Sequence, residues 1–237
     1  MLFRSVFVKE VQEAVRRGEA DLAVHSAKDL PAITPDGLVL AAFPERADVR
    51  DALVGSTLAA LGEGATVATG SVRRRVQLAA LRPDLVFVEL RGNMATRLAK
   101  AADVDAVVVA AAALDRLDLA DRIAERLEPS VLLPQVAQGA LAVECRVDDA
   151  RSLDALRAID DPLVHRAVAA ERAFLGALGG GCELPVGALA VLDGDEVRME
   201  ALLAADGAAP RRATGADVDP EALGRRLAHA LVETDRP

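Results

Sequence analysis

The chain has 237 residues, 52% of them hydrophobic, which is enough material for the cores of several domains and excludes a disordered protein. It carries 28 basic and 37 acidic residues and has neither Trp nor Tyr, so it lacks the basic surface and the stacking aromatics of a general nucleic-acid binder. The longest apolar run, 107–114, is too short to span a membrane, and the first residues lack a signal-peptide pattern. We therefore expect a cytoplasmic protein.

The first elements surround a short polar cluster. Ser5 is expected to cap a helix that presents apolar residues from Phe7 to Val15 on one face and ends at Gly18. Strands are predicted at 20–24 and 37–43. The cluster 25–29 follows the first of these strands directly.

The middle of the chain alternates strands with helices. A new set of elements starts at 51–54, and strands are predicted at 65–69, 85–90 and 105–111. The helices between and after them are predicted at 72–81, 94–100, 112–117 and 119–127. This alternation predicts a parallel sheet with helices on both faces, and such sheets bind ligands at the carboxyl ends of their strands.

The last part of the chain changes pattern. One more strand at 139–145 and a helix at 149–158 precede a long helix at 163–178, which ends at three glycines before Cys182. Strands at 186–192 and 197–204 flank a hairpin signal, and a helix at 220–232 follows. We expect a small α+β domain here.

Two predicted strand-to-helix turns carry arginines at the start of a helix. One contains Ser71, Arg73 and Arg74, and the other contains Arg91 and Asn93. Helix N-termini attract anions, so cations placed there are unfavourable unless an anion lies between them. The turns therefore indicate a pocket for carboxylates or phosphates, and the alternative is a set of solvated surface arginines.

Two further residues are candidates for chemistry. Asp29 lies beside Lys28 after a strand end, where an ionised carboxylate can stabilise a cationic intermediate or move protons. The alternative is an ordinary loop residue before Pro31. Cys182 lies on a glycine-rich loop and is a candidate for covalent attachment, the alternative being a buried free thiol. The two cysteines and three histidines form neither a disulfide framework nor a metal pattern.

Six motifs in order along the chain resemble those of the porphobilinogen deaminase (hydroxymethylbilane synthase) family. They span nearly the whole sequence, and six in register are far more specific than any one of them. The motifs cover residues 7–10, 20–31, 70–74, 90–98, 138–144 and 180–187.

The resemblance implies an α/β fold with two lobes like those of periplasmic binding proteins and a small α+β C-terminal domain. We expect the first domain to comprise 1–44 with 140–158, the second 50–134, and the third, which attaches the cofactor, 162–237. The family's first strands and a Gly-Thr-Arg-x-Ser motif have no counterpart in this sequence, so the first domain is expected to be incomplete at its N-terminus and unstable.

The resemblance also implies a reaction and a role for each matching residue. The family is a transferase of tetrapyrrole and heme biosynthesis that condenses four porphobilinogen molecules into hydroxymethylbilane, with release of ammonia. A dipyrromethane cofactor is attached by a thioether to the residue matching Cys182, and Asp29 matches the catalytic carboxylate. Residues matching known cofactor contacts are Ser26, Lys28, Ser71, Arg73, Arg74 and Asn93; those matching substrate contacts are Arg91, Arg97 and Arg116. No metal, nucleic-acid or membrane partner is implied, and a monomer is expected.

Two alternatives remain open from the sequence. The chain could be an inactive fragment of such an enzyme, or a non-enzymatic two-lobed module that binds carboxylates. The second alternative leaves Cys182 without a purpose.

Overall fold

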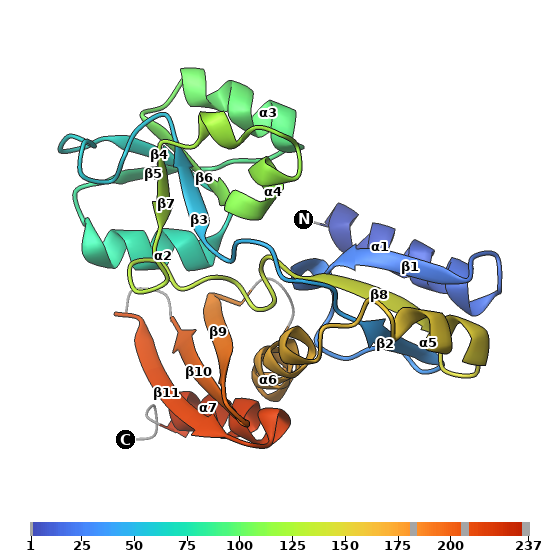
Figure 1. Ribbon diagram of the computed structural model, residues 1–237. Helices are drawn as coiled ribbons and strands as arrows, with labels where there is room; N and C mark the ends of the chain where they lie inside the picture. The colour runs from blue at the N-terminus through green and yellow to red at the C-terminus, as the bar shows by residue number, and fades with distance from the viewer. Residues whose placement is uncertain (1, 181–183, 205–208, 234–237) are drawn as a thin grey trace.

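The computed structural model describes residues 2–180, 184–204 and 209–233, with side chains from Val8 onward. Figure 1 shows three sheets, each with its own helices, joined by extended segments that cross in the middle of the molecule. We refer to the three parts as the first, the second and the C-terminal unit. The predicted α/β class, with two lobes and a small α+β part at the C-terminus, is confirmed.

The first unit combines the beginning of the chain with a strand from its middle. Its sheet has the order β1-β8-β2, and both pairs are antiparallel. Helix α1 packs on one face through Val15, and Leu156 of α5 packs against Val143 on another side. The elements are α1 (Leu2–Arg16), β1 (Leu22–Ser26), the 3-10 turn η1 (Ala27–Asp29), β2 (Leu38–Ala42), β8 (Leu141–Arg146) and α5 (Ala150–Leu156).

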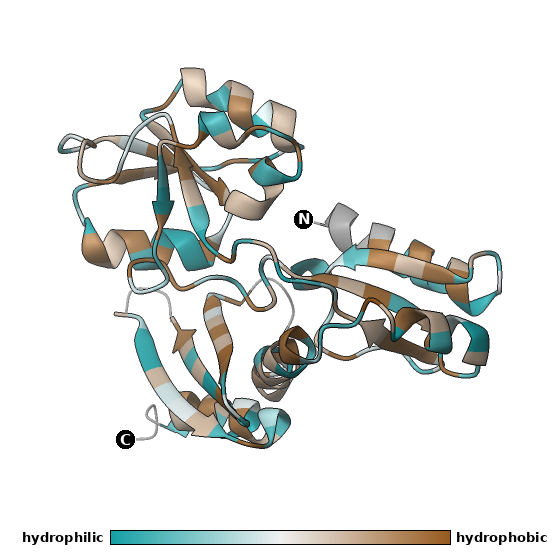
Figure 2. Cartoon of the chain, viewed as in Figure 1, coloured by the Kyte–Doolittle hydropathy of each residue, from teal (hydrophilic) through white to brown (hydrophobic). Residues whose placement is uncertain are grey.

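The second unit contains a five-stranded sheet of order β5-β4-β6-β3-β7 with a hydrophobic cluster on each face. Figure 2 shows hydrophobic residues along its central strands, and all five residues of β6 are buried. The strands are β3 (Asp51–Val54), β4 (Thr66–Ala68), β5 (Val86–Val88), β6 (Ala106–Ala110) and β7 (Glu125–Leu127). The helices are α2 (Val72–Leu81), α3 (Met94–Ala99), η2 (Lys100–Ala102), α4 (Ala111–Asp115) and η3 (Ala120–Arg122).

The C-terminal unit is an antiparallel meander of order β11-β10-β9 covered by two helices. Helix α7 approaches α6 so closely that a Cβ on Gly224 would lie 2.2 Å from the carbonyl oxygen of Ala170. The elements are α6 (Pro162–Ala177), β9 (Val186–Asp193), β10 (Glu196–Leu203), β11 (Arg211–Asp217) and α7 (Pro220–Glu233). Its core is continuous with part of the first unit, because Leu30 and Phe43 belong to the same buried cluster as Phe174 and Leu223.

Three expectations from the sequence are wrong, and one strand has no counterpart among them. Helix α1 begins at Leu2, so Ser5 lies inside it and is not its cap. The sheet of the second unit is mixed, because β3 pairs antiparallel with both β6 and β7. The segment 119–127, predicted as a helix, forms only the turn η3 and then β7, since pairing with β3 overrides its helical spacing. The strand β11 was not predicted because it is polar and half-exposed on alternate residues.

Two segments, 43–50 and 128–140, run between the first and second units and pass each other closely. At the crossing a Cβ on Gly139 would lie 2.5 Å from the carbonyl oxygen of Ala47, and Gly139 has a φ of +86°. Only glycine accommodates both the left-handed conformation and the close approach. Within the described residues, no helix is long and apolar enough to cross a membrane.

Candidate functional site

The two adjacent arginines of the first turn of α2 are buried rather than solvated. Arg73 is 3% exposed and Arg74 6% exposed, whereas the next residue, Arg75, is exposed. Ser71 caps the helix, since its Oγ accepts from the backbone N–H of Arg74 at 3.5 Å. Two neighbouring guanidiniums are thus carried into the interior at a helix N-terminus, where the helix dipole disfavours cations.

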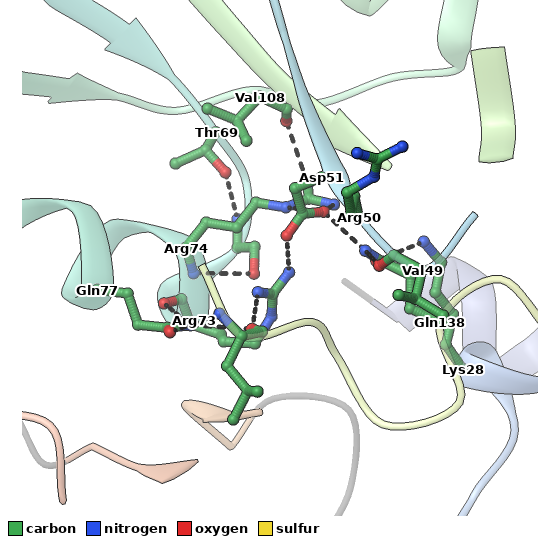
Figure 3. A network of polar contacts seen from close by, with 12 residues as sticks. Lys28, Val49, Arg50, Asp51, Thr69, Arg73, Arg74, Gln77, Val108 and Gln138 are labelled. Atoms are coloured by element: carbon green, nitrogen blue, oxygen red, sulfur yellow. Dashed lines mark hydrogen bonds and ion pairs between the residues drawn. The ribbon is translucent and has the colours of Figure 1, made fainter. Parts of the chain in front are cut away.

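The anion that balances these arginines within the chain is Asp51, the fully buried first residue of β3. Its carboxylate accepts from Nη2 of Arg73 at 2.7 Å and from Nε and Nη2 of Arg74 at 3.0 and 2.7 Å, as Figure 3 shows. The arginines also donate to backbone carbonyls, Arg73 to Leu133 and Arg74 to Val108. The second unit therefore holds a two-arginine, one-carboxylate cluster beside the crossing segments.

The charges in this cluster shift one another's pKa values. Burial alone would raise the pKa of Asp51, but Arg73 and Arg74 outweigh it and hold that pKa well below its usual range. Burial lowers the pKa of Arg73, and the attraction of Asp51 offsets part of that effect. The buried Nε of Arg73 has no hydrogen-bond partner within the described structure. A buried donor without a partner is costly, so this corner of the site is suited to an acceptor from a ligand.

A third cation joins the cluster from the first unit. Lys28 of η1 donates from Nζ to Oε1 of Gln138 at 3.2 Å, and Nε2 of Gln138 donates to Oδ1 of Asp51 at 2.9 Å (Figure 3). Burial and the nearby Arg74 lower the pKa of Lys28 to about 8, although Asp29 and Asp51 oppose the change. Lys28, Arg73 and Arg74 together bring more positive charge than Asp51 neutralises.

The other predicted residues of the first unit lie next to Lys28. Asp29 is the last residue of η1, and Ser26 is the last residue of β1; both are partly buried. His25 faces a different network, in which the buried Glu144 contacts Nε2 of His25 at 3.1 Å and accepts from Gln12 at 3.0 Å. His25 therefore serves the packing of α1 on the sheet rather than the cationic cluster.

The second arginine turn is more open and is not drawn into the cluster. Asn93 caps α3 by accepting from the backbone N–H of Thr96 at 2.9 Å. Arg91 is paired with Glu89 and its side chain is 79% exposed, while Nε of Arg97 donates to the carbonyl of Gly92. Arg116, exposed after α4, donates to the carbonyl of Gly139 at 2.8 Å.

Only one of the two cysteines, Cys145, lies within the described residues. Cys182 lies outside the described residues. Cys145 is fully buried in β8, and burial raises the pKa of its thiol. A buried thiol of raised pKa is a poor nucleophile.

Sequence reasoning missed two residues that organise the site, Asp51 and Gln138. The available signal for Asp51 was a lone carboxylate at the start of the apolar strand that continues through Ala52 and Leu53. Gln138 is the first residue of the motif at 138–144, and the sequence pattern indicates no function for its side chain. Both are fully buried polar residues, and burial is visible only in the folded chain.

The fold and the site together define an α/β protein that gathers cations from two units around a buried carboxylate. Two domain families of the same protein family match the chain. They are "Porphobilinogen deaminase, dipyromethane cofactor binding domain" over residues 3–154 and "Porphobilinogen deaminase, C-terminal domain" over residues 165–233. The chain belongs to the porphobilinogen deaminase family and contains its dipyrromethane cofactor-binding domain.

Named relatives agree with this assignment. The porphobilinogen deaminase of Roseiflexus sp. strain RS-1 is 52% identical over 237 residues, which cover 97% of this chain and 78% of that protein. The porphobilinogen deaminase of Brevibacillus brevis is 44% identical over 236 residues, covering 97% of this chain and 76% of that protein.

Proposed function

We propose that this chain is a transferase that joins four porphobilinogen molecules into hydroxymethylbilane on a covalently attached dipyrromethane. The observation that carries the proposal is the surplus of positive charge where three cations, Lys28, Arg73 and Arg74, meet around the two carboxylates of Asp51 and Asp29. Pyrroles of this pathway bear acetate and propionate groups, and such carboxylates are the anions that a guanidinium pair binds well.

The residues present fit a dipyrromethane. The unpartnered Nε of the buried Arg73 is suited to a ligand carboxylate, and Lys28 offers a second cation from the opposite unit. The proposed cofactor contacts are Ser26, Lys28, Ser71, Arg73, Arg74 and Asn93, with the thioether on Cys182. When bound, the dipyrromethane supplies the pyrrole carbon to which the first porphobilinogen is joined.

Asp29 is the proposed catalytic residue. In each condensation one C–N bond of porphobilinogen breaks, one C–C bond forms, and the displaced pyrrole proton and the amine leave together as ammonia. A carboxylate at this position can stabilise the positive charge that develops as the amine departs, and can accept the proton that the pyrrole carbon loses once the new C–C bond has formed. The placement of Asp29 at the end of η1, next to the cationic cluster, supports this role.

Arg91, Arg97 and Arg116 are proposed to bind the carboxylates of incoming porphobilinogen. They lie at the edge of the second unit rather than in its interior, and Arg91 is largely exposed. An exposed cation binds a single carboxylate weakly, so these residues suit a substrate that arrives and moves on, whereas the buried pair suits a permanent group.

Intact-mass measurement of protein made in cells that synthesise porphobilinogen tests the attachment. We expect a dipyrromethane adduct in the wild type, its loss in Cys182→Ala, and its retention in the matched control Cys145→Ala. An unmodified thiol at position 182 of the wild type would contradict the proposal.

The catalytic role of Asp29 is tested separately from attachment. We expect Asp29→Asn to retain the adduct and to lose at least about a hundredfold of porphobilinogen turnover, because general acid–base groups contribute roughly that much. Asp36→Asn, an exchange of the same kind outside the cluster, serves as the control. Turnover near the wild-type value in Asp29→Asn would remove the assigned role.

We further propose that the protein acts as a monomer in the cytoplasm. All the residues proposed for the site come from one chain, which supports a site that needs no second copy. Sedimentation of the adduct-bearing protein at working concentrations tests this, and a concentration-independent dimer would contradict it.

A further inference from the structure

Two buried residues link the cations of the first unit to those of the second. Gln138, in the crossing segment 128–140, and Asp51, at the start of β3, are both fully buried. The contacts form one continuous path from Nζ of Lys28 through the amide of Gln138 to the carboxylate of Asp51 and on to both guanidiniums (Figure 3).

The neighbours of Gln138 determine the orientation of its amide. Oε1 faces the ammonium of Lys28, whereas Nε2 donates to Asp51 and to the carbonyl oxygen of Val49, each at 2.9 Å. A flipped amide would place an NH2 group against the ammonium and an oxygen against the carboxylate, which is unfavourable at both ends. Gln138 thus accepts from a cation of the first unit and donates to an anion of the second.

The backbone of Gln138 is held as firmly as its side chain. Its carbonyl accepts from Nε of Arg46 at 2.9 Å, and the guanidinium of Arg46 pairs with the buried Glu171 of α6 at 2.7 Å. The neighbouring Gly139 is fixed against Ala47. The amide therefore has little freedom to follow Lys28 if the lysine moves, so the glutamine dictates where the ammonium lies.

We infer that Gln138 and Asp51 are positioning residues, which hold Lys28 and the two arginines as one cationic surface that receives the carboxylates of the dipyrromethane when the cofactor is loaded. This inference rests on the proposed function. It adds two residues that touch the binding cations and not the cofactor itself.

The charged groups acting on Lys28 make the inference testable through pH. Asp29 and Asp51 favour the ammonium, whereas burial, Arg74 and Arg73 disfavour it. The hydrogen bond to Gln138 favours the ammonium as well, because a charged donor makes a stronger hydrogen bond to Oε1 than a neutral amine does. Removing this acceptor lowers the pKa of Lys28 further. If attachment of the dipyrromethane needs the ammonium form of Lys28, the variant will stop attaching it at a lower pH than the wild type does.

The experiment follows adduct formation by intact mass. Full-length protein is produced in cells that cannot make porphobilinogen, and porphobilinogen is then added between pH 6.5 and 9.5. In Gln138→Met, a near-isosteric change without an acceptor, we expect the alkaline midpoint of loading to fall by about one pH unit, the size of one charge-assisted hydrogen bond. Gln12→Met, the same exchange at a buried glutamine that contacts Glu144 instead, should leave the midpoint unchanged.

A second pair of variants separates positioning from a general loss of structure. Lys28→Arg keeps its charge throughout this range, so it should abolish the alkaline limb, and adding Gln138→Met to it should then shift nothing. If Gln138→Met has lost its far-ultraviolet circular dichroism and is therefore unfolded, the rate of adduct formation in Asp51→Asn tests the inference instead. We expect Asp51→Asn to slow adduct formation at least about tenfold, and the control Asp48→Asn to form the adduct at the wild-type rate.

Each outcome bears on one proposal. The positioning role would be overturned if folded Gln138→Met had the same alkaline midpoint of adduct formation as the wild type, or if Asp51→Asn formed the adduct at the wild-type rate. Either result would leave the proposed function intact. A wild type that forms no adduct at any pH would instead remove the proposed function.

Discussion

Two carboxylates three positions apart in the chain are each paired with two arginines, in opposite surroundings. Asp51 is fully buried and binds Arg73 and Arg74. Asp48 lies in the crossing segment, with 18% of its side chain exposed, and binds Arg50 at 2.9 Å and Arg126 at 2.8 Å. We call them the inner and the outer carboxylate.

The difference lies in how many other anions each pair of arginines can reach. At the outer carboxylate, Arg50 also pairs with Glu128 and Arg126 with Asp115, so acidic groups outnumber the arginines. At the inner carboxylate, Lys28 adds a third cation to the contact path, and within the described residues Asp51 is the carboxylate that both arginines share. The outer cluster therefore has more acidic groups than arginines, whereas the inner one carries a surplus of positive charge.

Removing each carboxylate should give the largest contrast between the two clusters. Asp51→Asn leaves two buried guanidiniums without a counterion, and we expect a loss of about 3 kcal/mol in the free energy of unfolding. Asp48→Asn should cost about 1 kcal/mol or less, because its arginines keep their other carboxylates and contact water. Urea unfolding of both variants in a Cys182→Ala background measures the difference.

Equal losses of unfolding free energy in the two variants would contradict the contrast between a buried and a screened cluster.

The pH dependence of stability offers a further check, on the sign of the contribution from Asp51. Since the folded-state pKa of Asp51 is depressed, its contribution is fully present at neutral pH and is lost progressively as the pH falls from the ordinary pKa of an aspartate through the lower folded-state value.

The crossing that separates the two clusters should give the next largest effect. A Cβ at position 139 would meet the carbonyl oxygens of Ala47 at 2.5 Å and Asp48 at 3.1 Å, and the backbone there has a positive φ. Gly139→Ala should therefore destabilise the chain by about 2 kcal/mol. Gly37→Ala is the control, since it also has a positive φ but nothing within 4 Å of its Cβ.

For these glycines the relevant measurement is the difference in unfolding free energy between the two alanine variants. The strain of the positive φ is common to both, so the difference isolates the close approach of the two crossing segments. If Gly37→Ala costs as much as Gly139→Ala, the contact at the crossing contributes nothing.

The smallest expected effect is a pH dependence that belongs to the inner cluster alone. The pKa of Lys28 is lowered to about 8 from its ordinary 10.5 in the folded protein, so the unfolded chain binds more protons between these values. Stability should then rise with pH from 8 to 10.5 by about 1 kcal/mol relative to Lys28→Met, a modest amount because water screens the partly exposed ammonium. Lys100→Met, which removes an exposed lysine, is the control.

Comparing unfolding of adduct-free wild type and Lys28→Met at pH 8 and pH 10 checks this sign. A wild type that loses stability over that interval relative to Lys28→Met would show that the ammonium is favoured, not disfavoured, by its surroundings.

Much of the fold follows from local patterns. Helix α2 has the bounds predicted from the sequence, and in the structure Ser71 caps it. The fully apolar run of β6 likewise indicated a buried strand. The failures are elements that depend on distant partners: β7 exists because it pairs with β3, and β11 because it completes the meander with β10.

The site divides in the same way. The sequence predicted a turn that carries Arg73 and Arg74 and a ligand anion between them, but it could not reveal the internal partner Asp51, which is 22 positions away from Arg73 along the chain. Gln138 is 110 positions away from Lys28. Such partners are brought together only by the crossing of the two segments, and no local spacing encodes them.

The core that unites the first and C-terminal units has a mechanical consequence. Leu30 and Phe43 are packed with Phe174 and Leu223, so the first and C-terminal units share one core. The second unit has clusters of its own on both faces of its sheet and meets the C-terminal unit where Val76 packs against Leu202 and Ala204. The buried Glu171 of α6 binds Arg46 and the backbone N–H of Ala137, one residue from each crossing segment. A change at Glu171 would therefore disturb both crossing segments at once, and with them the placement of Gln138 between Lys28 and Asp51.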